Sequence, residues 1–196
     1  AIEELDVPWH PLITIDGVIG SEYPDPSLSL IWNNTIYCRL YLCQDSSFLY
    51  IAVAISDSTY NASDGIAICI GEEPPSPSRT PRESDHQMTV SRSGAFAAPG
   101  LTKYAIARAP GSSEWSAEVA IDFSELDLTA GLPRSIALAL FIRDDGQEIV
   151  RWPDDADKES PKTWGKLYSS YFWGAVDLVP QFLALSNQRP NTGEDV

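Results

Sequence analysis

Acidic side chains in one short loop are the residues whose spacing points most directly to chemistry. Asp155, Asp157 and Glu159 alternate as D-x-D-x-E, and the pair Asp144-Asp145 is expected nearby. Oxygen ligands with this spacing can converge on a hard cation such as calcium. The sequence therefore predicts a calcium site here, and the alternative is an acidic loop that only faces solvent.

Enzymatic and redox sites find no support among the remaining residues. Neither His10 nor His86 belongs to a nucleophile motif such as GxSxG, and carboxylate pairs are too common in so acidic a chain to indicate a glycosidase. Met88 alternates with predicted core positions, so it is interpreted as a core side chain and not as a haem ligand. No CxxC, CxxCH or Cys/His cluster is present to hold zinc. We therefore predict that the chain is not an enzyme.

The three cysteines leave two alternatives open. Cys38 and Cys43 stand five residues apart in one predicted strand, which is roughly 17 Å and too far for a disulfide. Either Cys69 pairs with one of them across neighbouring strands, or all three are small buried residues.

Two glycosylation sequons favour an extracellular or cell-surface protein. Asn33-Asn34-Thr35 and Asn61-Ala62-Ser63 both lie in polar stretches, which makes Asn33 and Asn61 candidate acceptors of N-linked glycans. A chain that begins at Ala1 also fits a secreted protein whose signal peptide has been removed.

The net charge limits the partners. The 196 residues contain 13 Lys and Arg against 28 Asp and Glu, a formal charge of −15. Such a surface repels phosphate backbones and anionic membranes, although it suits calcium. No run approaches the roughly 20 apolar residues of a membrane span. We expect neither a nucleic-acid partner nor a membrane span.

The elements that must position these residues are β-strands. In residues 35–57, two alternating runs flank the polar connector 44–47, which predicts a β-hairpin. Leu49, Ile51, Val53 and Ile55 share one face of its second strand, so that face is expected in a core. An isolated hairpin is marginally stable, and the rest of the chain should supply an opposing sheet.

Alternation elsewhere predicts further strands and no complete helix. A single helical turn is expected at residues 124–126, and residues 72–85 are an exposed loop because they are rich in Pro, Ser and charge. The predicted strands span residues 12–15, 65–71, 86–92, 103–109, 114–121, 135–142, 148–152 and 164–168. Short strands with regular turn signals predict an all-β, single-domain antiparallel β-sandwich over 1–196, with a two-sheet jelly-roll or immunoglobulin-like architecture.

Several stretches, taken in order, resemble family 9 carbohydrate-binding modules and the wider DOMON-like β-sandwich superfamily. The resemblance covers residues 12–168, and the stretches that carry it are ITIDGVIGSEY, FLYIAVAISD, DGIAICIG, HQMTVSRSG, EWSAEVAIDFSELDL, ALALFIRDDG and RWPDDADKESPKTWGKLY. It implies an extracellular, non-catalytic sandwich that holds a sugar between two aromatic rings and often carries structural calcium.

The resemblance also implies site residues. Trp152 stands where the family places one ring of its aromatic clamp, and Tyr60 stands near the other. Sugar faces stack on such rings while flanking donors bind the hydroxyl groups. The alternative for Trp152 is a ring that closes the edge of the sandwich. The family's acidic and basic positions on the next two strands are Ala67 and Thr89 in this chain.

Four further residues complete the candidate sites. Arg151 and Trp32 are the other candidate carbohydrate-binding residues, and Trp32 stands beside a sequon. Asp16 and Asp57 match acidic positions of the family and are further candidate calcium ligands. The partner that these sites imply is a polysaccharide or glycan.

The ends of the chain suggest a second function of another class. The resemblance stops near residue 168, yet residues 170–196 continue, and 175–186 alternate well enough to pair with a neighbouring copy. Residues 1–12 are likewise expected to lie outside the sandwich. The alternative function is therefore a structural subunit of an extracellular surface layer or filament that is assembled through exchange of terminal strands.

Overall fold

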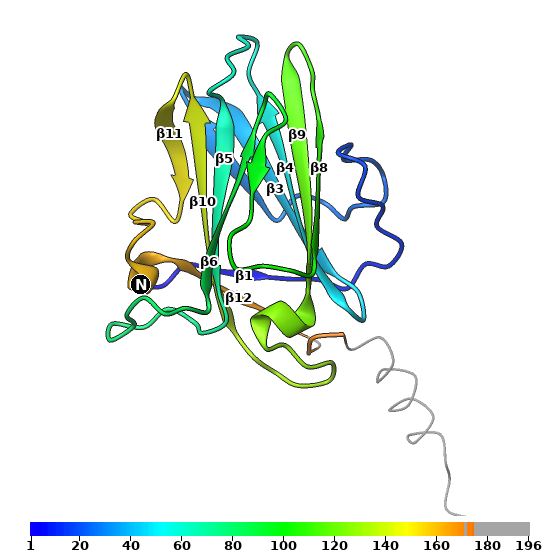
Figure 1. Ribbon diagram of the computed structural model, residues 1–196, viewed down its shortest axis with the longest axis vertical. Coiled ribbons are helices and arrows are strands. Elements are labelled where there is room, and N and C mark those ends of the chain that lie inside the picture. Colours follow the sequence, from blue (N-terminus) through cyan, green and yellow to red (C-terminus); the bar gives the residue numbers. More distant parts are fainter. Residues whose placement is uncertain (171, 175–196) are drawn as a thin grey trace, which may run out of the picture.

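The computed structural model describes residues 1–170 and 172–174, and these residues form two packed β-sheets (Figure 1). The strands are β1 (Glu4–Asp6), β2 (Leu28–Trp32), β3 (Thr35–Gln44), β4 (Phe48–Ser56), β5 (Gly65–Gly71), β6 (Asp85–Ser91), β7 (Phe96–Ala97), β8 (Tyr104–Ala109), β9 (Glu114–Asp122), β10 (Ile136–Asp144), β11 (Gln147–Trp152) and β12 (Gly165–Tyr168). Two short 3-10 turns, η1 (Phe123–Leu126) and η2 (Pro161–Thr163), connect them. The all-β sandwich prediction is confirmed.

The first sheet, called sheet A, has the strand order β1-β12-β10-β5-β6-β7, and β11 pairs with the second half of β10. The second, called sheet B, has the order β2-β3-β4-β9-β8. The predicted hairpin is β3–β4, whose register aligns Cys38 with Ile55 and Gln44 with Leu49. Within the described residues, no helix is long and apolar enough to cross a membrane.

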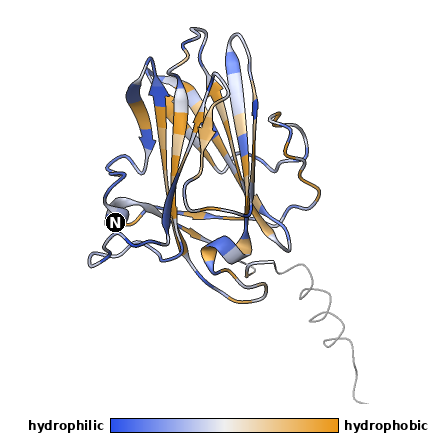
Figure 2. Ribbon diagram, viewed as in Figure 1, coloured by the Kyte–Doolittle hydropathy of each residue, from blue (hydrophilic) through white to orange (hydrophobic). Residues whose placement is uncertain are grey.

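The core lies between the two sheets because each strand turns one face of its alternation inward. Leu49, Ile51, Val53 and Ile55 of β4 are all buried there, together with Trp115 and Met88. Hydrophobic colour accordingly concentrates on the strands, and the connecting loops are mostly hydrophilic (Figure 2). At about 25 cal/mol per Å², burial of these side chains is the main stabilising contribution.

The structure supports the second alternative for the cysteines, in which all three are small buried residues. Cys38, Cys43 and Cys69 are all free and buried. Burial raises the pKa of each thiol to about 12, so the reactive thiolate is scarce at neutral pH. The three residues act as small core side chains.

The predicted strand near the N-terminus is absent. Residues 12–15 form no strand; Ile13 and Ile15 instead pack over the outer face of sheet B, beside Tyr50. The buried carboxylate of Glu118 on β9 fixes this segment by accepting the backbone N–H of Asp16 at 2.9 Å and the hydroxyl of Tyr23 at 2.8 Å. These bonds hold the segment that follows residues 12–15 against the outer face of sheet B.

The first residues of the chain belong to the sandwich, contrary to the expectation that they lie outside it. β1 pairs in parallel with β12 of the same chain, with Glu4 opposite Lys166 and Asp6 opposite Tyr168. The strand predicted at 175–186, and its pairing with a second copy, fall outside the described residues.

Candidate functional site

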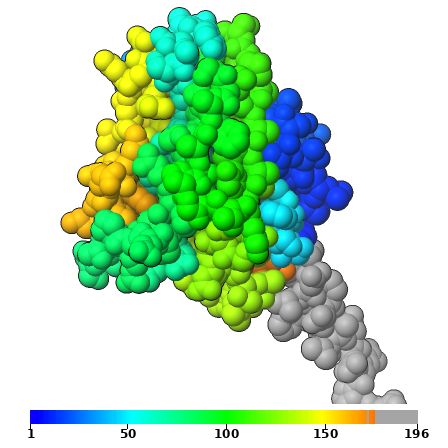
Figure 3. Space-filling model, in the orientation of Figure 1, coloured from blue at the N-terminus to red at the C-terminus, as the bar shows by residue number. Residues whose placement is uncertain are grey.

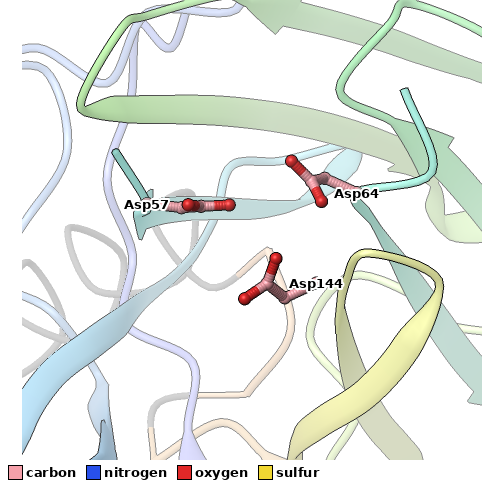
Figure 4. A group of neighbouring side chains, drawn as sticks. All are labelled: Asp57, Asp64 and Asp144. Carbon is pink, nitrogen blue, oxygen red and sulfur yellow. The ribbon is translucent and has the colours of Figure 1, made fainter. Parts of the chain in front are cut away.

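The upper end of the sandwich gathers acidic side chains that are distant in sequence. Asp57 follows β4, Asp64 precedes β5, and Asp144 ends β10 (Figure 1). One oxygen from each lies within 4.8 Å of the others, and Figure 4 shows the three carboxylates turned toward a common space. Among the described residues, no other set of three acidic, histidine or cysteine side chains is this close. We call these three residues the aspartate cluster.

Two of the three aspartates also fold the loop between β4 and β5. One oxygen of Asp57 accepts the N–H and the hydroxyl of Thr59, at 2.8 and 2.9 Å. Asp64 accepts the N–H of Asn61 at 2.8 Å and that of Asp145 at 2.9 Å. Aspartate side chains often close turns in this way, and the bonds fix both carboxylates in place.

Asp144 differs because its carboxylate accepts no hydrogen bond from the described residues. Burial raises its pKa, and the negative charges of Asp57, Asp64 and Asp145 raise it further. Tyr37 faces the same space: its hydroxyl is buried and has no hydrogen-bond partner among residues 1–170 and 172–174, and after burial the charges of the aspartate cluster are the next causes of its raised pKa. An unsatisfied phenol and a repelled carboxylate are the groups that a bound cation would stabilise.

Arg92 supplies the positive charge beside the cluster. Its side chain is fully buried and contacts Asp57 at 3.1 Å and Asp64 at 3.3 Å. It also donates to the backbone oxygens of Thr59, Asp57 and Gly111, which ties together the loops after β4, β6 and β8. Three carboxylates against one guanidinium leave a net negative charge at this end.

The predicted calcium loop does not assemble a site. Asp157 uses one carboxylate oxygen to accept the N–H of Glu159 at 2.9 Å, and both side chains are exposed, as is that of Asp155. Asp16 lies on the N-terminal segment, where it accepts the N–H of Val18. The prediction that Asp155, Asp157 and Glu159 converge is wrong, and of the five predicted ligands only Asp57 joins the cluster.

The predicted aromatic clamp is also wrong, because Trp152 is only 4% exposed. Its side chain points into the core together with Val150, since the two share one face of β11. Tyr60 is 63% exposed, but it lies at the aspartate end, with its ring centroid 5.5 Å from the guanidinium carbon of Arg92. The buried edge-closing alternative for Trp152 is the correct one.

The other two predicted sugar-binding residues do come together. Trp32, at the end of β2 and 40% exposed, and Arg151, on β11, line one hollow of about 300 Å³ with Ile149 and Asp154. Arg151 is held by a bond to the backbone oxygen of Ala156 at 3.0 Å and by Glu148 at 3.3 Å. This hollow, called the Trp32 hollow, offers an aromatic surface beside a guanidinium and a carboxylate.

The two sequons differ in accessibility. Asn33 is exposed in the β2–β3 turn, with a φ of 50°. Asn61 is half-buried, and its amide donates to Asp145 at 2.5 Å. Glycosylation at either residue stays a prediction.

Comparison with known proteins places the fold. No protein-family model and no curated protein sequence matches the chain. Among solved structures, a family 9 carbohydrate-binding module from Caldicellulosiruptor kristjanssonii in complex with cellotriose superposes with a TM-score of 0.70, over 85% of this chain and 93% of that chain, at 12% identity. The module from the same organism in complex with glucose gives 0.69, over 86% and 96%, also at 12% identity. The chain therefore has the fold of family 9 carbohydrate-binding modules, as its sequence resemblance predicts.

Proposed function

We propose that this chain is a non-catalytic, extracellular carbohydrate-binding domain that stacks a neutral sugar on Trp32. The fold is shared with modules solved in complex with glucose and cellotriose. The observation that carries the proposal is the exposed Trp32 ring in a hollow with Arg151 and Asp154. The ring provides an apolar surface for the C–H face of a sugar, while Arg151 offers a donor and Asp154 an acceptor for its hydroxyl groups.

Truncation of the stacking ring should remove binding. We expect Trp32→Ala to weaken the affinity for cellotriose at least about tenfold, because a stacked aromatic contact of about 1.5 kcal/mol corresponds to that factor. Isothermal titration calorimetry on protein made without N-linked glycans measures the change, since a glycan on Asn33 would stand beside the ring.

Phe96→Ala is the matched control, because Phe96 is another exposed aromatic, at 55% exposure, on a different part of the surface. It should bind cellotriose as the wild type does. Tyr60→Ala tests the competing position: if it abolishes binding while Trp32→Ala does not, the sugar lies at the aspartate end and the proposed site is refuted.

We also propose that the aspartate cluster holds a structural calcium ion. Calcium accepts oxygen ligands at about 2.3–2.6 Å, so oxygens within 4.8 Å of one another can share one ion. The residues that would hold it are Asp57, Asp64 and Asp144, with the unpartnered hydroxyl of Tyr37 at its edge. A bound divalent cation would balance the net negative charge that remains beside Arg92.

Calcium should stabilise the fold by mass action. At about 100 times its dissociation constant, a ligand of the native state adds about 2.7 kcal/mol, which is roughly 5–10 °C in Tm for a domain of this size. Thermal unfolding with calcium and with a chelator measures the shift.

Substitution of Asp144 should have opposite effects on stability in calcium and in chelator. Asp144→Asn removes a ligand, so we expect the calcium shift to disappear. In chelator the same variant should be more stable than the wild type at neutral pH, because a carboxyl whose pKa is raised in the folded state costs stability once the pH exceeds that pKa. The control is Asp155→Asn with Asp157→Asn, which should keep the full shift; loss of the shift in this control alone would place the ion in the D-x-D-x-E loop.

A further inference from the structure

Residues 11–26 cross the outer face of sheet B between two fixed ends, and we call them the strap. Before the strap, His10 donates its backbone N–H to the backbone oxygen of Gln44 at 2.9 Å. After it, Ser27 donates its backbone N–H to the backbone oxygen of Leu40 at 2.8 Å. Figure 3 shows this part of the chain (blue) on the right side of the molecule. Both ends of the strap are therefore attached to β3.

Few hydrogen bonds hold the strap between its two ends. The backbone of Tyr23 bonds to that of Gly20 within the strap, but no backbone–backbone bond joins the strap to another described residue. The four hydrogen bonds that join it to the rest of the described chain all go to the side chains of Glu118 and Ser116 on β9. Segments with so few bonds to their surroundings open locally at a lower free energy than global unfolding requires.

Glu118 is the main attachment point of the strap. Its carboxylate is 0% exposed and accepts the backbone N–H of Asp16 at 2.9 Å, that of Gly17 at 2.5 Å and the hydroxyl of Tyr23 at 2.8 Å. Gly17 has a φ of 91°, and an added Cβ would stand 2.4 Å from the carbonyl carbon of Arg108. The strap backbone thus lies directly on β8 at the point where Glu118 holds it.

No cation balances the buried carboxylate of Glu118 within the described chain; its contacts are neutral donors. Arg39 lies on the same face but two strands and two residues away, at roughly 12 Å. The side chain opposite Glu118 on β8 is Ala107, which carries no charge. The other charged or titratable groups of this face are Asp16, Glu22 and Tyr23 of the strap, Tyr41 and Cys43 of β3, Tyr50 of β4, and Glu114 and Asp122 of β9.

The ionisation of Glu118 is therefore coupled to closure of the strap. Burial raises the pKa of Glu118, and the charge of Asp16 also raises it, although the three hydrogen bonds act in the opposite direction. When the strap is open, water solvates this carboxyl group, so the closed form binds the proton more tightly than the open form. Closure is then strongest below the ordinary pKa of glutamate and weakens as the pH rises through the raised value.

The strap covers an apolar strip of sheet B. Tyr23 packs there on Cys43, Tyr50, Ala52 and Ala120, and all five side chains are buried. Because Cys43 points to this outer face, its thiol reaches solvent when the strap opens.

Cys38 lies on the same strand, but it is buried in the core between the two sheets. Its thiol reaches solvent only when the sandwich itself unfolds. The chain therefore carries a reporter of the strap and a matched reporter of global unfolding.

We propose that the strap is a conformational device that opens as a unit about its two ends, releases Glu118 and uncovers the outer face of sheet B, and that a rise in pH favours the open form. The proposal does not depend on the proposed sugar and calcium sites.

Thiol labelling with 4,4′-dithiodipyridine tests the opening. In a Cys69→Ala background, tryptic cleavage after Arg39 places Cys38 and Cys43 on separate peptides for mass spectrometry. Each rate is divided by that of the same thiol in the urea-unfolded chain. We expect Cys43 to react at least about tenfold faster than Cys38, which corresponds to an opening free energy about 1.4 kcal/mol lower. Equal rates would refute a strap that opens separately from the sandwich.

Two variants test the attachment. Glu118→Gln can make the same three hydrogen bonds without a buried charge, so its Cys43 should react more slowly than that of the wild type at about pH 8. The ratio of the wild-type rate to the variant rate should rise at least about threefold from about pH 5 to about pH 8. A ratio that stays constant or falls would refute control by Glu118.

Gly17→Ala leaves Glu118 in place but adds a methyl group against the backbone of β8. Its Cys43 should react at least about tenfold faster than that of the wild type, while Cys38 keeps its rate. Equal acceleration of both thiols would mean that the strap is not a separate unit and would refute the proposal.

Discussion

Replacement of Arg92 by methionine is expected to lower the free energy of unfolding by about 3–5 kcal/mol, the usual cost of removing one partner from a buried ion pair. Methionine retains much of the volume but none of the five contacts that the guanidinium makes to Asp57, Asp64 and three backbone oxygens. Two buried carboxylates would then face Asp144 without a counter-ion. Urea unfolding at neutral pH in chelator measures the loss.

Two further measurements separate this cause from a general loss of packing. Calcium should restore more stability to Arg92→Met than it adds to the wild type, because the variant's cluster is more negative. Arg82→Met, which breaks an exposed pair with Glu73, should cost less than about 1 kcal/mol. Equal losses in the two variants would mean that the cluster carries no uncompensated charge.

Alternation of apolar and polar residues was sufficient to predict most strands, because strands of a two-sheet sandwich turn one face to a common core. The predicted strand at residues 65–71 is β5 without any shift, and the helical turn predicted at 124–126 lies within η1. Residues 12–15 carry the same alternation but form no strand. Ile13 and Ile15 are partly buried against the outer face of sheet B, and local sequence does not distinguish this kind of burial from burial between the sheets.

The aspartate cluster could not be predicted from spacing, since Asp64 meets Asp144 only through the pairing of β5 with β10, and Asp57 joins them from the end of β4 in the other sheet. The D-x-D-x-E spacing suggested that its three carboxylates bind one ion. In the structure, the carboxylate of Asp157 instead accepts a hydrogen bond from the backbone of the same loop. The grouping of Trp32 with Arg151 likewise depends on the approach of β2 to β11 across the edge of the sandwich. A site that is built from the ends of several strands can be predicted only when the strand pairing is known.

Trp152 is the case in which the sequence held the correct signal. Val150 and Trp152 are two residues apart and share a strand face, so burial of one implies burial of the other, and Arg151 must point outward. The resemblance to the family's aromatic clamp instead predicted that the Trp152 ring is exposed to a sugar. In the structure the indole lies against Gly165 of β12, where an added Cβ would stand 2.1 Å from the ring.

Trp152→Ala should therefore act on stability and leave sugar binding in place. We expect a loss of about 3–5 kcal/mol in the free energy of unfolding, the range for removal of a large aromatic side chain from a core. Gly165→Ala should also destabilise the protein, because the new methyl group collides with the ring that Trp152→Ala removes. Chemical unfolding of both single variants and of the double variant measures the coupling, and the double variant should lose less than the sum of the two.

Calorimetry with cellotriose at a temperature where the Trp152→Ala variant remains folded completes the test. An affinity equal to that of the wild type is expected, since the exposed Trp32 ring and the outward side chain of Arg151 do not depend on the buried indole for their contact with a ligand. A variant that unfolds like the wild type but no longer binds the sugar would restore Trp152 as a stacking residue and would contradict the buried position that its strand alternation requires.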